Sequence, residues 1–334
     1  MSGEVPANAS REDTPLGNYS RRFAEIGKDD VQLCGGKGAN LGELTAAGFR
    51  APAGFCITSP ALAHLVRFNA LDEVIADAAA RLDFDDPSAL EAQTARIREL
   101  VASARIPPDL EYEIVDRYRE LVGASGRHVS VRSSVAVRDS PISSFPGMMD
   151  TYHYVLGQEQ VLEAVRACWA SLWTARAAFT RHRRGIAHDR GLIAPLVQLM
   201  VDADTAGVLF TANPVTKSEA EIVIESNWGI GESVVSGRSR NDFYVVAKDE
   251  LAVKERQIAS KTVMVTLDSG AGSGRKEQDV PSSLATSPTL SDDQLVELSE
   301  TGKRIEQHFE FPVDVEWAYA AGTLYVLQAR RAAF

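Results

Sequence analysis

The sequence contains few cysteines and no long hydrophobic run. Three cysteines occur among 334 residues, at Cys34, Cys56 and Cys168, and none lies in a Cys-x-x-Cys spacing. An odd number without that spacing excludes a disulfide framework and a four-cysteine zinc site. No stretch approaches the roughly 18 apolar residues of a membrane span, and the N-terminus has no basic segment followed by an apolar run. We therefore expect a cytoplasmic protein that does not bind a membrane.

Basic residues are also fewer than acidic residues. The chain has 35 Lys and Arg against 46 Asp and Glu, which gives a formal net charge of -11. A chain with this balance is a poor candidate for binding the phosphate backbone of nucleic acid. Any anionic ligand must therefore be held by a local cluster of basic side chains.

Motifs of the commoner catalytic classes are missing from the sequence as well. The six histidines do not fall in a His-Glu-x-x-His spacing, and there is neither a Gly-x-Ser-x-Gly motif nor a Cys/His signature. Hydrolysis by a serine or cysteine nucleophile therefore has no support in this chain.

The chain reads as a helix-rich part followed by a strand-rich part. The polar residues 1–20 predict a disordered tail. Residues 21–195 predict a helix-rich N-terminal lobe, and residues 196–331 predict a β-rich C-terminal lobe. Within the second lobe, the Gly-, Ser- and Pro-rich stretch 268–290 predicts a long mobile loop. The cleft between two lobes is the natural place for a ligand.

Several helix boundaries are predicted by proline and by capping residues. Asp85-Asp86-Pro87 and Pro107-Pro108 mark joints between helices. Apolar residues spaced by three and four predict one long amphipathic helix over 159–184. Ser291 followed by Gln294 fits a capping box, so we expect the last helix to run from there to about residue 308.

A glycine-rich turn at Gly35-Gly36-Lys37-Gly38 precedes helical sequence that begins near Ala39. Glycines before a helix let backbone N–H groups approach an anion at the positive helix end, and Lys37 adds a charge there. The motif is not a Walker A loop, because Gly38 stands where that loop needs Ser or Thr. Two interpretations stay open, an anion-binding turn and an ordinary turn with a surface lysine.

Arg132 lies in the middle of an apolar strand, within the sequence VSVRSS (129–134). Burying a guanidinium without a partner is costly. Arg132 therefore either pairs with a structural carboxylate or faces a cleft that receives phosphate. The nearby stretch 143–151, which includes Gly147, offers hydroxyls and amides that can close over phosphates without adding charge.

Two predicted strands at the end of the sequence carry charged and amide side chains at alternate positions. Asp314 and Glu316 share one strand face, and Gln328 and Arg330 share a face of the next strand. If the strands pair antiparallel, these four side chains converge. Carboxylate and amide oxygens suit Mg²⁺ that bridges to phosphates, and Arg330 suits a phosphoryl oxygen. The open alternative is a solvated sheet edge.

Together and in this order, these motifs resemble the N-terminal nucleotide-binding domain of the phosphoenolpyruvate synthase and pyruvate, phosphate dikinase family, which rifampin phosphotransferases share. The resemblance covers roughly residues 23–331. The matching blocks are GGKGANLGEL (35–44), AGFRAPAGFCIT (47–58), VSVRSS (129–134), FPGMMDTY (145–152), ACWASLWTARA (167–177), VQLMVDADTAGVLFTANPVT (197–216), ESNWGIGESVVSG (225–237) and VDVEW…LYVLQAR (313–330).

The resemblance implies an α+β, ATP-grasp-like fold in which two lobes clamp ATP and a divalent metal. It implies that three basic residues hold the ATP phosphates and carry the catalysis, namely Lys37, Arg132 and Arg330. It further implies that Glu316 and Gln328 lie on the metal side, with Asp314 as an acidic neighbour. The implied cofactors are ATP and Mg²⁺.

The resemblance also implies positions for the base and for a closing loop. Gln198, Met200 and Val201 match the segment beside the adenine, where backbone groups read the base edge. The segment FPGMMDT, with Gly147, matches the loop that closes on the phosphates.

Full-length relatives pass a phosphoryl group from ATP to a histidine on a swivelling domain, and then to pyruvate, an antibiotic or another acceptor. No histidine of this sequence lies in such a setting. We therefore expect an ATP-dependent phosphotransferase subunit that works with a separate phosphohistidine-domain and acceptor-binding protein. Two alternatives stay open, a self-contained small-molecule kinase or ATP-dependent ligase, and a non-catalytic nucleotide-binding module.

Overall fold

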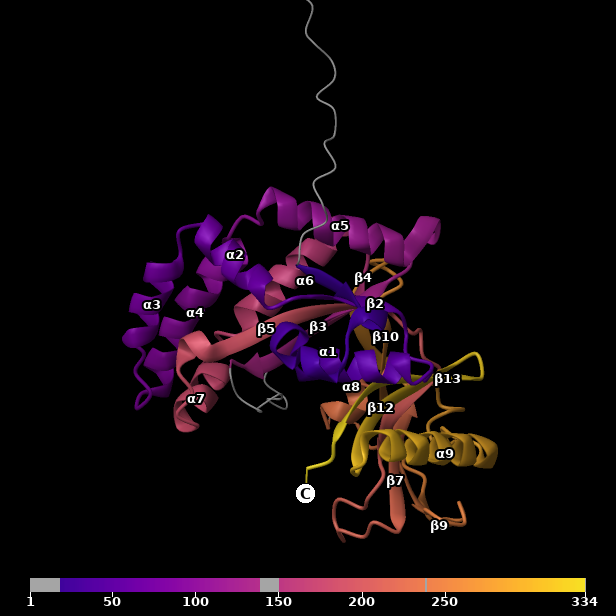
Figure 1. Cartoon of the computed structure of the whole chain (residues 1–334). Helices are drawn as coiled ribbons and strands as arrows, with labels where there is room; N and C mark the ends of the chain where they lie inside the picture. Colours follow the sequence, from indigo (N-terminus) through magenta and orange to yellow (C-terminus); the bar gives the residue numbers. More distant parts are fainter. Residues whose placement is uncertain (1–18, 139–149, 238, 334) are drawn as a thin grey trace, which may run out of the picture.

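The computed structural model describes residues 19–138, 150–237 and 239–333 (Figure 1). Within these ranges the chain forms an α+β structure with a five-stranded sheet, a six-stranded sheet and a two-stranded hairpin. Figure 1 shows the six-stranded sheet and its helix below the five-stranded sheet and its helices. No helix in the described ranges has the length and apolar character needed to cross a membrane.

The first sheet is entirely antiparallel and has the strand order β1-β2-β5-β3-β4. Its strands are β1 (Ser20–Arg22), β2 (Gly54–Ile57), β3 (Val129–Val137), β4 (Thr151–Val155) and β5 (Gly191–Leu199). The helices around it are α1 (Val31–Ala46), α2 (Pro60–Phe68), α3 (Asp72–Ala80), α4 (Pro87–Ser103), α5 (Pro108–Val122), α6 (Gln158–Ser171) and α7 (Ala175–Arg183). Short 3-10 helices span Phe23–Glu25, Lys28–Asp30, Gly123–Ser125 and His188–Arg190.

The second sheet is also antiparallel and has the order β13-β12-β6-β7-β8-β9. Its strands are β6 (Thr205–Phe210), β7 (Glu221–Trp228), β8 (Asp242–Ala247), β9 (Val253–Gln257), β12 (Val313–Ala320) and β13 (Thr323–Arg331). The short helix α8 (Glu232–Val235), the hairpin of β10 (Val263–Leu267) with β11 (Arg275–Asp279), and the helix α9 (Asp292–Phe309) complete this part.

Both predicted proline joints are confirmed. Asp86 accepts hydrogen bonds from the amides of Ser88 and Ala89, so α4 begins at Pro87 with a satisfied cap. The helix α5 begins at Pro108, where the missing N–H costs nothing. The capping box at Ser291 is present as well.

The single helix predicted over 159–184 is wrong. Its apolar face continues, but the chain breaks between α6 and α7 because Thr174 adopts an extended conformation. The Thr174 side chain accepts a hydrogen bond from the Ala177 amide and thereby starts a second helix.

The predicted loop over 268–290 is corrected in part. The strand β11 pairs with β10 along its whole length, from Asp279 opposite Val263 to Arg275 opposite Leu267.

The predicted lobe boundary at 195/196 falls inside β5, which belongs to the first sheet through its pairing with β2 and β3. The disordered tail predicted for residues 1–20 lies outside the described residues up to residue 18, and β1 begins at Ser20.

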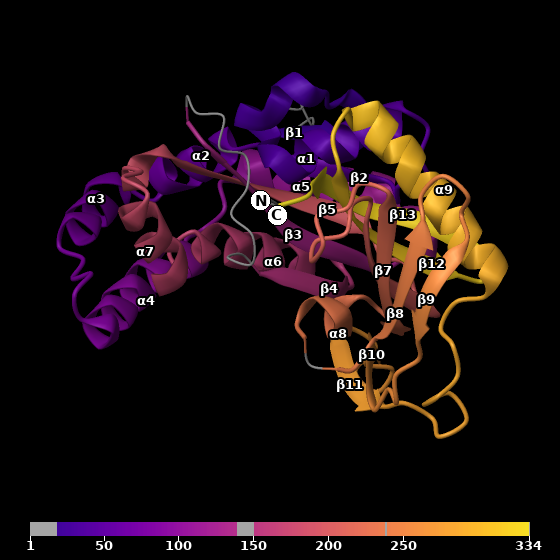
Figure 2. The same cartoon turned by 90° about the horizontal axis from the view of Figure 1, so that it is seen from below.

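Alternation along the strands separates two hydrophobic cores. Val131 and Val197 point into a core built with α4, α5 and α6. Leu196, one residue earlier on β5, points to the opposite face and packs with α1 and α9 in a second core. In Figure 2, α9 runs beside the second sheet while α3, α4 and α7 lie at the other end of the molecule. The second core contains residues of both lobes and joins them.

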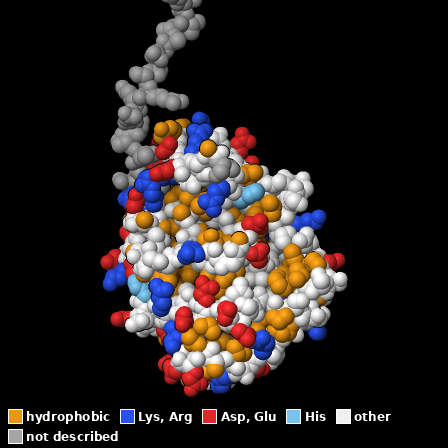
Figure 3. All heavy atoms as spheres, turned by 90° about the vertical axis from the view of Figure 1, so that its right-hand side faces the viewer, with side chains coloured by type: hydrophobic (Ala, Val, Ile, Leu, Met, Phe, Trp, Pro, Cys, Tyr) orange, Lys and Arg blue, Asp and Glu red, His pale blue; other side chains and the backbone are white. Residues whose placement is uncertain are grey.

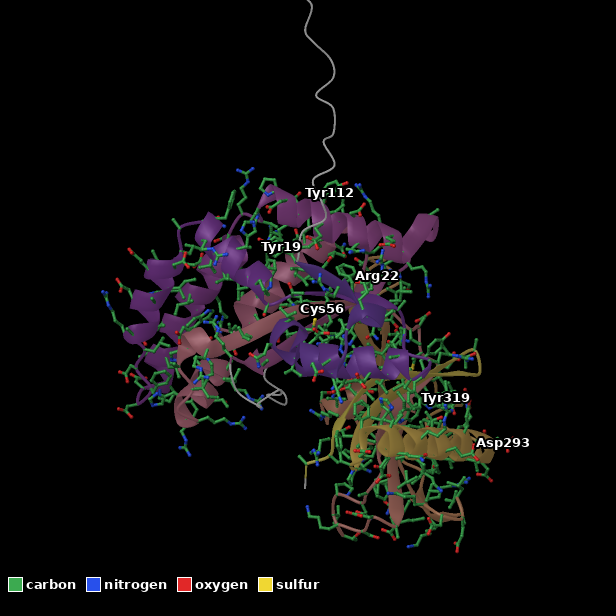
Figure 4. The ribbon with its side chains drawn as sticks, in the orientation of Figure 1. Tyr19, Arg22, Cys56, Tyr112, Asp293 and Tyr319 are labelled. Atoms are coloured by element: carbon green, nitrogen blue, oxygen red, sulfur yellow. The ribbon has the colours of Figure 1, made fainter. Side chains whose placement is uncertain are left out.

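Tyr319 attaches α9 to the second sheet. Its hydroxyl donates to Glu297 Oε2 at 2.8 Å and lies 3.2 Å from the Gln294 carbonyl oxygen. Figure 4 shows Tyr319 near the first turn of α9, where Asp293 is labelled. On the face shown in Figure 3, basic and acidic side chains are interspersed, with apolar side chains between them.

Candidate functional site

A cavity of about 1040 Å³ opens between the two sheets. Its walls come from α1, β3, β4 and β5 on one side and from β6, α8, β12 and β13 on the other. Eight of the ten residues predicted to form the site line this cavity, namely Lys37, Arg132, Gln198, Met200, Val201, Glu316, Gln328 and Arg330. Asp314 lies behind the wall, in contact with Arg330. Gly147 lies outside the described residues.

The last two strands pair antiparallel, which is the condition under which their four side chains were expected to converge. Asp314 lies opposite Arg330, and Glu316 lies opposite Gln328. Arg330 Nε donates to Asp314 Oδ2 at 2.8 Å. The Asp314 side chain is 9% exposed and that of Arg330 is 37% exposed. Asp314 therefore holds the base of the guanidinium while Arg330 reaches the cavity.

Arg132 comes to the cavity from β3 because even-numbered residues of this strand face away from the helical core. Its Nη2 donates to Glu316 Oε2 at 2.5 Å and to Gln328 Oε1 at 2.9 Å, and its Nη1 donates to the Leu327 carbonyl at 3.2 Å. Arg132 therefore pairs with a carboxylate, as one of the two interpretations required, and it also lines the cavity, whereas binding of phosphate there stays a prediction. Its Nε has no hydrogen-bond partner within the described part of the chain.

A kink at Gly35 brings Lys37 to the same cavity. The helical segment begins at Val31, before the glycines, and Gly35 interrupts it with φ 68° and ψ 174°. We expected the helix to begin only after this turn. A Cβ atom on Gly35 would lie 2.2 Å from Ser134 Oγ, so only glycine allows α1 to approach β3 this closely. The same Ser134 hydroxyl accepts the Gly38 amide at 3.1 Å.

The charged side chains of this cluster shift one another's pKa values. Burial, with the nearby charge of Arg132, lowers the pKa of Lys37 to about 8. For Glu316, burial opposes ionisation, but the charges of Arg132 and Lys37 outweigh it and hold the pKa below its usual value. Burial raises the pKa of Asp314 despite its contact with Arg330. The cavity wall is thus a charged cluster with more cations than anions.

The other end of the cavity is mainly apolar. Leu199, Met200, Val201 and Ile230 line it. Gln198 is buried, and its side-chain amide donates to the Pro52 carbonyl at 3.2 Å. The cavity therefore offers an apolar end and a cationic end to one ligand.

Among the polar residues of the cavity wall, His153 and Glu232 were not singled out from the sequence, whereas Thr151 belonged to the stretch 143–151 that we expected to close over phosphates. Thr151 lies directly opposite Arg132 in the β3–β4 pairing. The alternating segment TYHYV (151–155) signals a strand that would place Thr151 and His153 on one face. Glu232 had no comparable signal, because α8 has only four residues.

Comparison with known proteins gives concordant matches. Residues 31–334 match the family model described as "Pyruvate phosphate dikinase, AMP/ATP-binding domain". A probable phosphoenolpyruvate synthase of Pyrococcus horikoshii is 40% identical over 93% of this chain and 43% of its own length. The phosphoenolpyruvate synthase of Pyrococcus furiosus is 39% identical over the same shares of the two chains. The rifampicin phosphotransferase of Bacillus cereus is 34% identical over 94% of this chain and 36% of its own. The chain spans less than half the length of these relatives.

Proposed function

Because the chain belongs to the pyruvate phosphate dikinase AMP/ATP-binding domain family, we propose that its cavity binds Mg·ATP and donates a phosphoryl group, as the nucleotide-binding part of a phosphotransferase of the phosphoenolpyruvate synthase type. The observation that carries this proposal is the convergence of Lys37, Arg132 and Arg330 on one cavity that also has an apolar end. The two sheets on either side of the cavity support an ATP-grasp-like arrangement.

Lys37, Arg132 and Arg330 bind the triphosphate in this proposal. Three cations in a partly buried wall offset much of the negative charge of a nucleoside triphosphate. Phosphoryl transfer needs little covalent help from the protein, so fixed positive charge near the transferred group is the main contribution. The residues from Gln198 to Val201 lie beside the base.

Glu316 and Gln328 hold Mg²⁺ in this proposal. No group of three or more His, Cys, Asp or Glu side chains in the described ranges is arranged to hold a metal ion. Mg²⁺ in nucleotide sites takes only one or two protein oxygens and completes its shell with phosphate and water. The two adjacent oxygen donors on β12 and β13 fit such an ion. When bound, the ion supplies positive charge at the phosphate oxygens.

The acceptor in this proposal is a histidine outside the cavity wall. All six histidines are described, and only His153 lines the cavity. Burial, together with Arg132 and Arg275, lowers its pKa to about 4, and its Nδ1 faces Glu232 rather than open space. An imidazole nitrogen of a separate domain forms the new P–N bond as the P–O bond to the nucleotide breaks. The phosphoryl group then passes to pyruvate or another small acceptor.

The test combines the chain with ATP, MgCl₂ and a histidine-bearing phosphoryl-carrier domain. We expect acid-labile, alkali-stable phosphate on the carrier, and none when Lys37→Met or Arg330→Met replaces the wild type. ATP binding without any transfer would contradict the carrier role. Absence of ATP binding would contradict the whole proposal. Turnover of ATP by the pure chain with a small acceptor would favour a self-contained kinase or ligase instead.

A further inference from the structure

A second cavity, of about 570 Å³, lies on the face of the six-stranded sheet opposite to the cavity described above, which is here called the first cavity. Side chains alternate along β12, so Glu316 and Ala318 line the first cavity, whereas Tyr319 lines the second. The segment that leads into α9 and the neighbouring ends of β6 and β7 complete the second wall. None of the described residues that we propose to contact ATP or Mg²⁺ lines it.

Three residues in register form one row of this wall. Tyr319 lies opposite Thr205, and Thr205 lies opposite Trp228, so the threonine lies between two aromatic side chains. The Tyr319 hydroxyl donates to Glu297 Oε2, and Trp228 Nε1 donates to the Leu284 carbonyl at 3.0 Å. Thr205 is 3% exposed, and its Oγ1 has no hydrogen-bond partner among the described residues. A buried hydroxyl that is left unpaired costs free energy, which a ligand atom can recover.

The second wall carries more negative than positive charge. Asp204 and Asp292 contribute carboxylates, and Arg256 contributes a guanidinium that forms an ion pair with Asp292. Asp204 makes no ion pair within the described ranges, and its Oδ2 accepts the Ala321 amide at 2.7 Å. The cavity adjoins the first turn of α9, but Ser291 already caps that helix. The wall therefore favours a cation over an anion.

The segment before α9 is held in place by a buried ion pair. Lys261 Nζ lies 2.6 Å from Asp242 Oδ1, and both side chains are fully buried. The other carboxylate oxygen, Asp242 Oδ2, accepts the Thr289 amide at 2.8 Å and the Thr289 hydroxyl at 2.9 Å. Thr289 lines the second cavity beside Leu290. This part of the wall is thus fixed before a ligand arrives, which lowers the cost of binding.

We propose that the second cavity binds an alkylammonium or alkylguanidinium cation. The cationic N–H group donates to Thr205 Oγ1 and to the Asp204 carboxylate, and the alkyl stem packs against Trp228 and Leu290. Hydrogen bonds to a charged partner are the stronger ones, and an aromatic ring also attracts a cation. The same chemistry belongs to a lysine or arginine side chain of a partner protein and to a free amine. The inference is independent of ATP binding.

The test uses the full chain with ¹⁵N-labelled tryptophan. The indole N–H resonance of Trp228, identified by its loss in Trp228→Phe, reports on the second cavity while butylguanidinium or butylammonium chloride is added. We expect a saturable shift with a dissociation constant of about 1 mM for a ligand with so few atoms. Sodium butyrate and butanol supply a similar stem without the positive charge and should give no saturable shift. An equal response to butyrate would overturn the cation site.

Variants of two residues locate the contacts of the cation. Thr205→Val removes the hydroxyl and keeps the shape of the side chain, so we expect about 10-fold weaker binding. Its melting temperature should not fall, because no described residue bonds this hydroxyl. Thr205→Ser keeps the hydroxyl and should keep most of the affinity. Asp204→Asn should also weaken binding about 10-fold, whereas its matched control, Asp249→Asn at an exposed turn, should not. Unchanged affinity in both Thr205→Val and Asp204→Asn would contradict the assignment.

Capped amino acids distinguish the two sources of the cation. Nα-acetyl-lysine methylamide and Nα-acetyl-arginine methylamide carry the side chain as a partner protein would present it. If they bind at least as tightly as the simple cations, the site receives a side chain of a partner. If they bind more weakly or not at all, the site receives a free amine. Either result supports the cation site, and a wild type that binds none of these cations overturns it, whether or not the first cavity binds ATP.

Discussion

Arg132 on β3 and Glu316 on β12 form an ion pair across the cleft, with the guanidinium Nη2 2.5 Å from the carboxylate Oε2. The two residues are 184 positions apart in the sequence and belong to different sheets. Glu316 supplies the counter-charge of Arg132 when no ligand is bound. Without it the buried guanidinium would be strongly unfavourable. Arg132 in turn keeps Glu316 ionised. The cationic wall can therefore exist before an anion arrives.

Breaking this pair is expected to destabilise the protein. Arg132→Met leaves Glu316 in a partly buried wall without its main counter-charge, and the expected loss is about 3 kcal/mol at neutral pH. The pKa of Glu316 is lowered in the folded state, so its contribution is present above pH about 4.5 and lost as pH falls further. Denaturant unfolding at pH 7 and at pH 4 measures the difference, which should shrink at the lower pH.

Two control variants distinguish the loss of the Arg132–Glu316 pair from the general effect of replacing an arginine. Arg132→Met combined with Glu316→Gln removes both charges and should regain part of the stability without regaining ATP binding. Arg22→Met removes exposed ion pairs with Glu25 and Glu120 and should cost less than about 1 kcal/mol. An equal loss for Arg22→Met and Arg132→Met would contradict the structural importance of the cleft pair.

Gly35→Ala is expected to disturb the site as well as the fold. The new Cβ would meet the Ser134 side chain and the backbone of Ser134 and Val135, so α1 must move away from β3. Lys37 would move with it, and we expect ATP affinity to fall at least about 10-fold, which corresponds to the loss of one charged contact. Unfolding curves and calorimetric titration of the same samples test both effects.

Gly48→Ala is the matched control for this substitution. Gly48 also has a positive φ, of 76°, but no atom lies within 4 Å of its Cβ position. It should therefore show only the backbone cost of alanine in that conformation, about 1 kcal/mol, with unchanged ATP affinity. If the two variants behave alike, steric contact with β3 is not what requires Gly35.

The site was predictable from the sequence where local periodicity determines it. Asp314 and Glu316 had to share a face, and so did Gln328 and Arg330, because strand side chains alternate. The approach of Arg132 to Glu316 could not be derived in this way, since it depends on how two sheets pack around α1. The resemblance to a known family supplied that connection.

The fold was less predictable where local signals were weak or contradictory. The apolar pattern of α6 and α7 is continuous, so only the Thr174 cap reveals the break between them. The strand β11 is exposed along its length and has the sequence RKEQD, which no strand propensity favours. It forms because β10 offers a pairing edge, and that is a property of the tertiary structure.

ATP affinity is expected to depend on pH through Lys37. Its pKa of about 8 in the free protein means that the ammonium is mostly charged at pH 7 and mostly neutral at pH 9. Triphosphate binding favours the charged form, so affinity should fall as pH rises from 7 through 8, with uptake of up to one proton per ATP bound. Calorimetry at pH 8.5 in two buffers of different ionisation enthalpy measures that uptake. Lys37→Met should bind more weakly at every pH and take up no proton, and persistence of the uptake in this variant would assign it to another group.

Mg²⁺ is expected to bind tightly only together with the nucleotide. In the ligand-free protein, Glu316 and Gln328 both contact the Arg132 guanidinium, so a free cation at these oxygens would meet a positive charge at close range. Triphosphate oxygens reverse that local charge and supply the remaining metal ligands.

With Mn²⁺ as a spectroscopic probe, we expect no saturable binding below about 1 mM metal without nucleotide, and tight binding in the presence of ATP. Glu316→Gln should weaken the ternary binding about 10-fold or more, whereas Glu300→Gln on the exposed face of α9 should not. Micromolar binding of the metal to the wild type without nucleotide would show that Glu316 and Gln328 form a metal site on their own, contrary to the role inferred from their contacts with Arg132.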